Sequence, residues 1–381
     1  MIEDFRKLYG SADGVRIFRA PGRVNLIGEH TDYNLGFVMP MALQLATWVA
    51  AAPAPDGKLR LYSEDFEEQR EFEPAQIRTL QRQRHWSDYP IGVAQELIRA
   101  GFPIEPANIL IRSTVPEGSG LSSSAALEVS SALAFLCGRP MPPLDMAQLC
   151  QRAEVNFVGM PCGIMDQYVS VFGREGFAVE IDCRSLTHRD APLPAGISFL
   201  AVNSMVKHAL AGSAYKDRVQ ECAAAVEQIK LRFPMVESLR DVSVEQFESV
   251  ADLLPAVIAR RARHVITEDA RVEQCAAAAA RGDVAQIGRL MLESHHSLQN
   301  DYEVSCAELD FLVDTALKID GVIGSRMTGG GFGGCTVTML RPETADRFRA
   351  EIVSAYERRF KVTPRIYECR PSAGAAEVSA D

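Results

Sequence analysis

A glycine- and serine-rich segment stands out in the first half of the chain. Residues 115–128 read Val-Pro-Glu-Gly-Ser-Gly-Leu-Ser-Ser-Ser-Ala-Ala-Leu-Glu, between a strand-like stretch and a helix-like one. Gly118 and Gly120 permit close backbone approach, and the first turn of the helix offers free N–H groups and a positive dipole end. The pattern predicts a phosphate cradle, with a serine-capped helix as the alternative. It is not a Walker A loop, because the sequence has no GxxxxGK(S/T) motif, and it is not a dinucleotide fingerprint, because Ser123 stands in place of the third glycine.

Four ionisable side chains cluster near the start of the chain. Residues 21–33 read Pro-Gly-Arg-Val-Asn-Leu-Ile-Gly-Glu-His-Thr-Asp-Tyr, which brings Arg23, Glu29, His30 and Asp32 close together. Sugar hydroxyls both donate and accept hydrogen bonds, so carboxylates and an imidazole suit a sugar site. A metal site ranks lower, because a second histidine or cysteine at ligand spacing is missing. A solvated turn is the remaining alternative.

A single carboxylate, Asp166, lies among apolar residues in the segment Gly-Met-Pro-Cys-Gly-Ile-Met-Asp-Gln at 159–167. A carboxylate that leaves water needs a partner or loses its charge. We therefore expect either a helix cap or buried ion pair, or a general base that a cation keeps ionised. Arg23 is the candidate cation.

A second glycine-rich segment, Gly-Ser-Arg-Met-Thr-Gly-Gly-Gly-Phe-Gly-Gly-Cys at 324–335, runs directly into a β-rich stretch. Glycine this dense weakens regular structure and permits close backbone approach. A flexible linker is the usual alternative, but a linker does not lead straight into a strand. We expect an active-site loop here.

These segments need a mixed α+β framework to position them. Alternation predicts strands at 15–20, 43–52, 58–62, 108–115, 335–340 and 361–367, with a hairpin across 53–57. Helical spacing of apolar residues predicts helices through 146–157, 219–229 and 309–317. The proline-containing stretch 186–196 is the best boundary, which divides the chain into domains 1–190 and 191–381. We expect the tail, 371–381, to fray.

Composition narrows the classes of function. The 381 residues carry a formal net charge of -10, and a basic stripe typical of a nucleic-acid binder is missing. The longest apolar stretch, residues 37–54, is too interrupted to span a membrane, and the N-terminus does not resemble a signal peptide. Nine cysteines without a CxxC pair indicate free thiols. We expect a cytoplasmic protein without nucleic-acid or membrane partners, as a monomer or weak homo-oligomer.

In this order and spacing the four segments resemble the galactokinase family of the GHMP kinase superfamily, over about residues 18–340. The resemblance implies an N-terminal ribosomal-protein-like domain and a C-terminal ferredoxin-like domain. It implies phosphorylation of the anomeric hydroxyl of galactose by ATP with Mg²⁺, as the first committed step of galactose catabolism.

The resemblance also implies roles for individual residues. Asp166 would be the base and Arg23 its partner, while Ser124 and Glu154 would bind Mg²⁺. The sugar would lie against Glu29, His30, Thr31, Asp32, Gly163 and Tyr215. The nucleotide would lie against Ser63, Trp86, Gly118, Ser119, Gly120, Leu121, Ser122, Ser123 and Ser124.

Two other functions fit the same segments. An N-acetylgalactosamine kinase shares similar motifs, and the sequence does not display a pocket for the acetamido group. A sugar- and ATP-binding transcriptional sensor would lose residues from the Ser-Ser-Ser-Ala-Ala run, which is intact here at 122–126. The intact run, with Asp166 and Arg23 both present, favours the enzyme.

Overall fold

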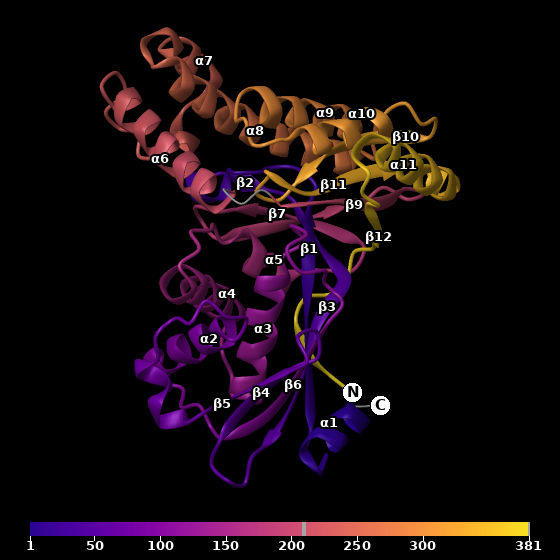
Figure 1. Cartoon of the computed structure of the whole chain (residues 1–381). Helices are drawn as coiled ribbons and strands as arrows, with labels where there is room; N and C mark the ends of the chain where they lie inside the picture. The colour runs from indigo at the N-terminus through magenta and orange to yellow at the C-terminus, as the bar shows by residue number, and fades with distance from the viewer. Residues whose placement is uncertain (208–210, 380–381) are drawn as a thin grey trace.

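The computed structural model of the chain describes residues 1–207 and 211–379. Two lobes follow one another along the chain, the first indigo to magenta and the second magenta through orange to yellow (Figure 1). Helices and strands are mixed in both lobes, so the α+β class that the sequence predicts is confirmed. Among the described residues, the helices are all too short or too polar to cross a membrane.

A six-stranded sheet forms the back of the first lobe in the order β13-β1-β3-β6-β4-β5. The predicted hairpin across 53–57 is wrong, because β6 lies between the two strands and pairs with both. Ile109, Leu110 and Ile111 of β6 are all buried, which requires a central strand with two neighbours. The strands are β1 (Arg16–Asn25), β3 (Pro40–Pro53), β4 (Leu59–Ser63), β5 (Glu68–Phe72), β6 (Ala107–Ser113) and β13 (Ala376–Val378).

The C-terminal tail returns to this first sheet, so the expectation that it frays is wrong for the described residues. β13 pairs antiparallel with β1 through Ile17 and Val378. Arg16 donates from Nε to Oε1 of Glu377 over 2.7 Å. The predicted division between residues 190 and 191 falls inside β8 (Thr187–Pro192).

Helices cover one face of the six-stranded sheet, with α3 packed directly on β1 and β3. The apolar side chains between them form one core of the first lobe. A small sheet in the order β2-β7-β8 continues toward the second lobe. The elements of this face and of the small sheet are α2 (Asp88–Arg99), α3 (Ser123–Leu136), α4 (Pro143–Arg152), the π turn η3 (Ala153–Val158), α5 (Met165–Phe172), β2 (Phe37–Val38) and β7 (Phe177–Asp182). Helix α1 (Ile2–Tyr9) packs on the opposite face of the six-stranded sheet.

The second lobe has an antiparallel sheet in the order β10-β11-β9-β12. A helical segment follows β9 and another follows β11, which is the ferredoxin-like arrangement that the resemblance implied. Helices α10 and α11 pack on one face of the sheet, whereas α9 lies against β10 and α8 packs on α9 (Figure 1). The elements are β9 (Ser198–Lys207), α6 (Ala211–Lys230), α7 (Val244–Glu248), α8 (Ala256–Arg281), α9 (Val284–Asn300), α10 (Ala307–Ala316), β10 (Val322–Thr328), β11 (Gly333–Leu340), α11 (Ala345–Phe360) and β12 (Arg365–Cys369).

Candidate active site

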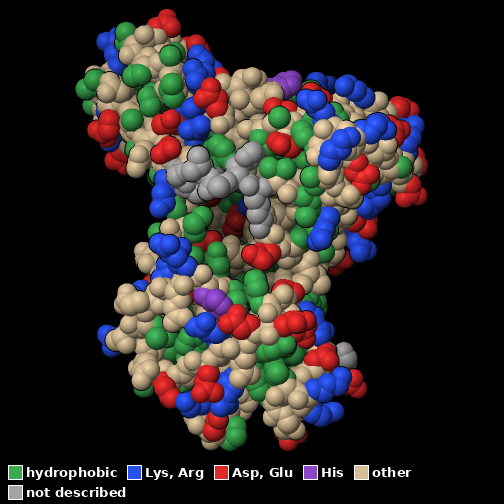
Figure 2. Space-filling model, viewed as in Figure 1, with side chains coloured by type: hydrophobic (Ala, Val, Ile, Leu, Met, Phe, Trp, Pro, Cys, Tyr) green, Lys and Arg blue, Asp and Glu red, His purple; other side chains and the backbone are tan. Residues whose placement is uncertain are grey.

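The site lies between the lobes, where the surface is hollowed and both acidic and hydrophobic side chains gather (Figure 2). A smaller cavity of about 270 Å³ lies against the glycine-rich turn between β10 and β11. A larger one of about 980 Å³ lies against the segment before α3. The two cavities meet at four residues that line both of them: Arg23, Glu154, Met160 and Asp166.

Asp166 and Arg23 form a two-pronged ion pair at this junction. Nε of Arg23 donates to Oδ1 of Asp166 over 2.9 Å, and Nη2 donates to Oδ2 over 2.8 Å. The Ser122 hydroxyl also donates to Oδ2, and Nη1 of Arg23 donates to the Gly120 carbonyl. Asp166 is in the first turn of α5 and Arg23 is on β1, so the fold joins residues that are far apart in sequence. A bidentate pair of this kind fixes the position of both groups.

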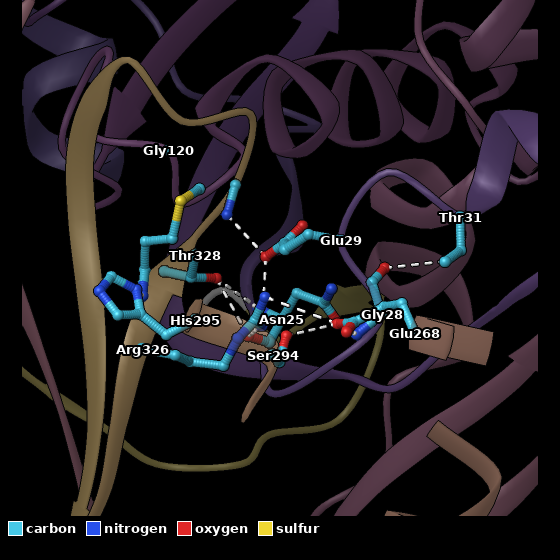
Figure 3. A network of polar contacts seen from close by, with 12 residues as sticks. Asn25, Gly28, Glu29, Thr31, Gly120, Glu268, Ser294, His295, Arg326 and Thr328 are labelled. Carbon is cyan, nitrogen blue, oxygen red and sulfur yellow. Dashed lines mark hydrogen bonds and ion pairs between the residues drawn. The ribbon is translucent and has the colours of Figure 1, made fainter. Parts of the chain in front are cut away.

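Glu29 lies in the wall of the smaller cavity, deep between the lobes (Figure 3). Its Oε1 accepts from the backbone N–H of Gly329 over 2.7 Å and lies 3.5 Å from Nη1 of Arg326. Burial raises the pKa of Glu29, while Arg326 and Arg23 oppose that rise. One oxygen is therefore held by the second lobe, and the carboxylate is positioned for a ligand in the cavity.

His30 also lines the smaller cavity, with a backbone φ of 64° that turns its ring inward. Nδ1 lies 2.9 Å from the hydroxyl of Tyr33, and Nε2 has no hydrogen-bond partner among the described residues. Burial lowers the pKa of His30 to about 3. The imidazole is thus neutral at physiological pH and presents one uncommitted nitrogen.

Asp32 lies directly against Gly163 in the wall of the smaller cavity. A Cβ on Gly163 would lie 1.9 Å from Oδ2 of Asp32, so this position excludes any larger residue. Burial raises the pKa of Asp32 to about 7, and the nearby charge of Asp166 adds to the rise. The group therefore exchanges a proton near neutral pH.

Two other predicted sugar residues differ in their surroundings. Tyr215 lines the cavity, with its ring centroid 5.4 Å from that of His30 and 5.5 Å from that of Tyr33. Thr31 is fully buried, and its hydroxyl is hydrogen-bonded to the carbonyls of Gly28 and Phe37. The structure therefore gives Thr31 a part in shaping the loop, and brings the other five predicted residues to the cavity.

The phosphate loop divides its side chains between cavity and interior. Ser119 donates its hydroxyl to the Pro116 carbonyl over 2.7 Å, and Leu121 is fully buried in the core between the lobes. Ser119 and Leu121 therefore attach the loop to the protein interior. The loop residues that line the larger cavity are Gly118, Gly120, Ser122, Ser123 and Ser124, at the N-terminus of α3.

Ser124 and Glu154 form a hydroxyl–carboxylate pair beside Asp166. Burial raises the pKa of Glu154 to about 7, Asp166 adds to the rise, and a hydrogen bond from Ser124 opposes it. Nε2 of Gln167 donates to Oε2 of Glu154 over 2.6 Å. Mg²⁺ prefers one or two protein oxygens together with phosphate and water. These oxygens, at the rim of the larger cavity, fit such an ion.

Ser63 and Trp86 both line the larger cavity. Trp86 stacks on Phe66 at an interplanar angle of 4°, and its Nε1 donates to Glu68 over 3.3 Å. His85 lies 2.9 Å from the same carboxylate. The indole is therefore held in place while still facing the cavity.

Sequence reasoning missed the residues that hold the sugar-side groups in place. Arg326 is fully buried and lies between Glu29 and Glu268, whose Oε1 also accepts from the N–H of Gly28 over 2.9 Å. The Ser294 hydroxyl donates to the same Oε1, as Figure 3 shows. The available signal was a single charged residue in an otherwise uncharged strand next to the glycine-rich turn.

Comparison with known proteins agrees with this geometry. Residues 3–53 match the galactokinase galactose-binding signature, residues 88–174 the GHMP kinases N-terminal domain, and residues 275–358 the GHMP kinases C-terminal region. Galactokinase of Roseiflexus sp. (strain RS-1) is 47% identical over 99% of this chain and 96% of its own. Galactokinase of Homo sapiens is 46% identical over 92% of this chain and 90% of its own.

Solved structures give the same result. Lactococcus lactis galactokinase complexed with galactose superposes with a TM-score of 0.95 at 34% identity, covering 99% of this chain and 98% of the other. Mevalonate kinase of Methanococcus jannaschii shares the fold, with a TM-score of 0.68 at 19% identity over 94% of this chain and 99% of its own. With a signature, two domains and near full-length relatives in agreement, the chain belongs to the galactokinase family of the GHMP kinases.

Proposed function

We propose that the chain transfers the γ-phosphoryl group of ATP to the anomeric hydroxyl of galactose. The observation that carries this proposal is the shared wall of the two cavities, where Asp166 and Arg23 are exposed to both. A sugar in the smaller cavity and a nucleotide in the larger one would meet at this pair. Phosphoryl transfer needs such an in-line meeting, because it depends mostly on positioning and electrostatics.

Asp166 acts as the general base in this proposal. Its carboxylate accepts the proton of the anomeric hydroxyl as that oxygen attacks the γ-phosphorus. Arg23 keeps the carboxylate oriented through two hydrogen bonds, and its charge offsets negative charge that develops on the transferring group. Glu29, His30 and Asp32 orient the sugar from the other side of the smaller cavity.

The segment before α3 holds the phosphates. Its backbone and the Ser122 hydroxyl, together with Ser123 and Ser124 in the first turn of α3, line the larger cavity at the positive end of the helix dipole. Ser124 and Glu154 would hold Mg²⁺, and Ser63 and Trp86 would contact the nucleoside. When bound, Mg²⁺ supplies positive charge to the β- and γ-phosphate oxygens.

The test is ADP release from ATP and Mg²⁺ with galactose, N-acetylgalactosamine, glucose and arabinose offered separately. We expect rapid release with galactose and little with the other three sugars. ADP release with N-acetylgalactosamine alone would identify that sugar, and not galactose, as the substrate. Galactose binding without ADP release from any sugar would contradict the kinase assignment and favour a sensor.

A further inference from the structure

A chain of buried hydrogen-bonding groups runs outward from His30 into the second lobe. Nδ1 of His30 lies 2.9 Å from the hydroxyl of Tyr33, which lies 2.7 Å from the hydroxyl of Tyr302. That hydroxyl in turn lies 3.1 Å from Sγ of Cys222 on α6. His30 and Tyr33 belong to the first lobe and Tyr302 follows α9, so the chain joins the lobes behind the smaller cavity.

Packing fixes the positions of these hydrogen-bonded side chains. The ring centroid of Tyr302 lies 4.8 Å from that of His30 and 4.5 Å from that of His264, and Tyr302 is fully buried. Burial raises the pKa values of Tyr33 and Tyr302 well above the usual range, so both hydroxyls keep their protons. Each hydroxyl carries one hydrogen, and the direction of one bond therefore fixes the direction of the next.

The chain has two possible directions, with opposite consequences for the cavity. If Tyr33 donates to Nδ1, the proton of the neutral imidazole is on Nε2 and the cavity receives a donor. If Nδ1 donates to Tyr33, the cavity receives a bare lone pair instead.

The surroundings of the cavity favour the first direction. The carboxyl groups of Glu29, Asp32 and Asp166 line the same cavity, and their acceptor oxygens attract an N–H but repel a lone pair.

We propose that Tyr33 and Tyr302 are positioning residues that hold His30 as the Nε2–H tautomer, so that His30 meets the substrate as a hydrogen-bond donor. The donor would pair with the oxygen of one sugar hydroxyl, while the surrounding carboxylates accept from other hydroxyls. The kinetic consequence rests on the proposed function, but the tautomer itself is a property of the free protein.

The tautomer is measured by nitrogen NMR of the free full-length chain with ¹⁵N-labelled histidine at pH 7. The His30 signals are assigned from their loss in His30→Gln. We expect an unprotonated Nδ1 and a protonated Nε2, with Tyr33→Phe giving a mixture of tautomers. The matched control is Tyr356→Phe, which removes another fully buried hydroxyl, one that donates to the Ser204 carbonyl over 2.8 Å. It should leave the His30 signals unchanged.

Kinetics supply the second readout. Tyr302→Phe keeps the ring and removes one hydrogen bond, so the KM for galactose should rise roughly threefold to tenfold. Tyr33→Phe should raise this KM further. The KM for ATP should stay within about twofold in both variants, as should both constants in Tyr356→Phe.

A set of monodeoxygalactoses shows whether His30 acts through one hydroxyl. For one of these sugars, the loss caused by Tyr302→Phe should disappear, because its partner oxygen is already missing. A protonated Nδ1 in the free protein would overturn the proposal, as would equal changes in the two KM values. If galactose were no substrate at all, the proposed function would fail, and the NMR result would still decide the tautomer.

Discussion

The two cavities that meet at Asp166 are built in different ways. The smaller one is enclosed by buried ionisable side chains, of which Glu29, His30 and Asp32 each have a partner from the protein. The larger one combines backbone and hydroxyl groups of residues 118–124 with charged side chains, among them Asp65, Arg82 and Arg84, and with the stacked rings of Phe66 and Trp86. The first therefore suits discrimination among hydroxyl patterns, and the second suits a phosphate chain that every ATP shares.

This contrast teaches where substitutions should be selective. Substitutions behind the smaller cavity should change the KM for galactose alone, and substitutions around the larger cavity should change the binding of the nucleotide alone. Only substitutions in the shared wall should change kcat. Variants that ignore this division would break the comparison.

The largest effect is expected at the shared wall. Asp166→Asn keeps the shape and can still contact Arg23, but an amide cannot accept the proton, so we expect kcat to fall by roughly a thousandfold or more. Galactose binding, measured by calorimetry, should weaken by less than about threefold. Near-normal turnover would show that Asp166 is not the general base.

On the sugar side, Arg326→Met should raise the KM for galactose about tenfold or more. The substitution leaves Glu29 and Glu268 buried without their cation, and the free energy of unfolding should fall by roughly 3–5 kcal/mol. Arg326→Lys keeps the charge and is the matched control, with smaller losses in both measurements. Equal increases in the KM values for galactose and ATP would show that the two sides are not separable.

On the nucleotide side, Glu154→Gln should raise the Mg²⁺ concentration needed for half-maximal ATP binding about tenfold. A neutral amide is a weaker ligand for this hard cation than a carboxylate. Glu117→Gln, at an exposed carboxylate of the same cavity, is the control and should behave like the wild type. An unchanged Mg²⁺ dependence in Glu154→Gln would assign the ion to other oxygens.

Trp86 offers a smaller and more direct test of the nucleotide cavity. The chain has two tryptophans, so Trp48→Phe leaves Trp86 as the sole indole. A non-hydrolysable ATP analogue should change its fluorescence, and Trp86→Ala should raise the KM for ATP roughly threefold to tenfold. Fluorescence that ignores the analogue would place the nucleoside elsewhere.

The smallest effect concerns stability and compares Asp32 with a carboxylate outside both cavities. Burial raises the pKa of Asp269, like that of Asp32, to about 7, and its Oδ1 accepts from the N–H of Phe37 over 2.7 Å. Unfolding restores a pKa of about 4, so from pH 4 to pH 7 the folded chain holds a proton that the unfolded chain has lost. The free energy of unfolding therefore falls as pH rises through this window.

Asp269→Asn removes that contribution without touching either cavity. Urea denaturation at several pH values should show the wild type losing roughly 1 kcal/mol or more relative to the variant between pH 5 and pH 7. If the free energies of unfolding of the wild type and the variant changed in parallel with pH, Asp269 would be ionised over the whole range from pH 5 to pH 7.

Much of the site could be predicted because its residues cluster in short segments. Four such segments identified the family and its α+β fold. Arg23 was named as the candidate cation for Asp166, and the structure pairs the two, although Asp166 is only half-buried. The roles of individual site residues, the division at 190/191, the cytoplasmic location and the oligomeric state stay predictions. The site roles, the location and the oligomeric state depend on a ligand, a compartment or a partner rather than on the fold.

Long-range pairing could not be predicted from local patterns. The turn residues at 53–57 indicate that the chain reverses direction. They do not indicate that β6 lies between β3 and β4 in the sheet. Nothing in the small residues of the tail indicates a partner as distant as β1. Arg326, Tyr33 and Tyr302 escaped notice for the same reason, because their partners are remote in sequence or belong to the other lobe.

The central claim is that the anomeric hydroxyl of galactose, and no other, faces Asp166. The most direct measurement is phosphorus NMR of the product made by the wild-type protein from ATP and galactose labelled with ¹³C at carbon 1. The account predicts a single sugar phosphate whose phosphorus signal is split by the labelled carbon. A sugar phosphate without that splitting, or inorganic phosphate alone, would contradict it.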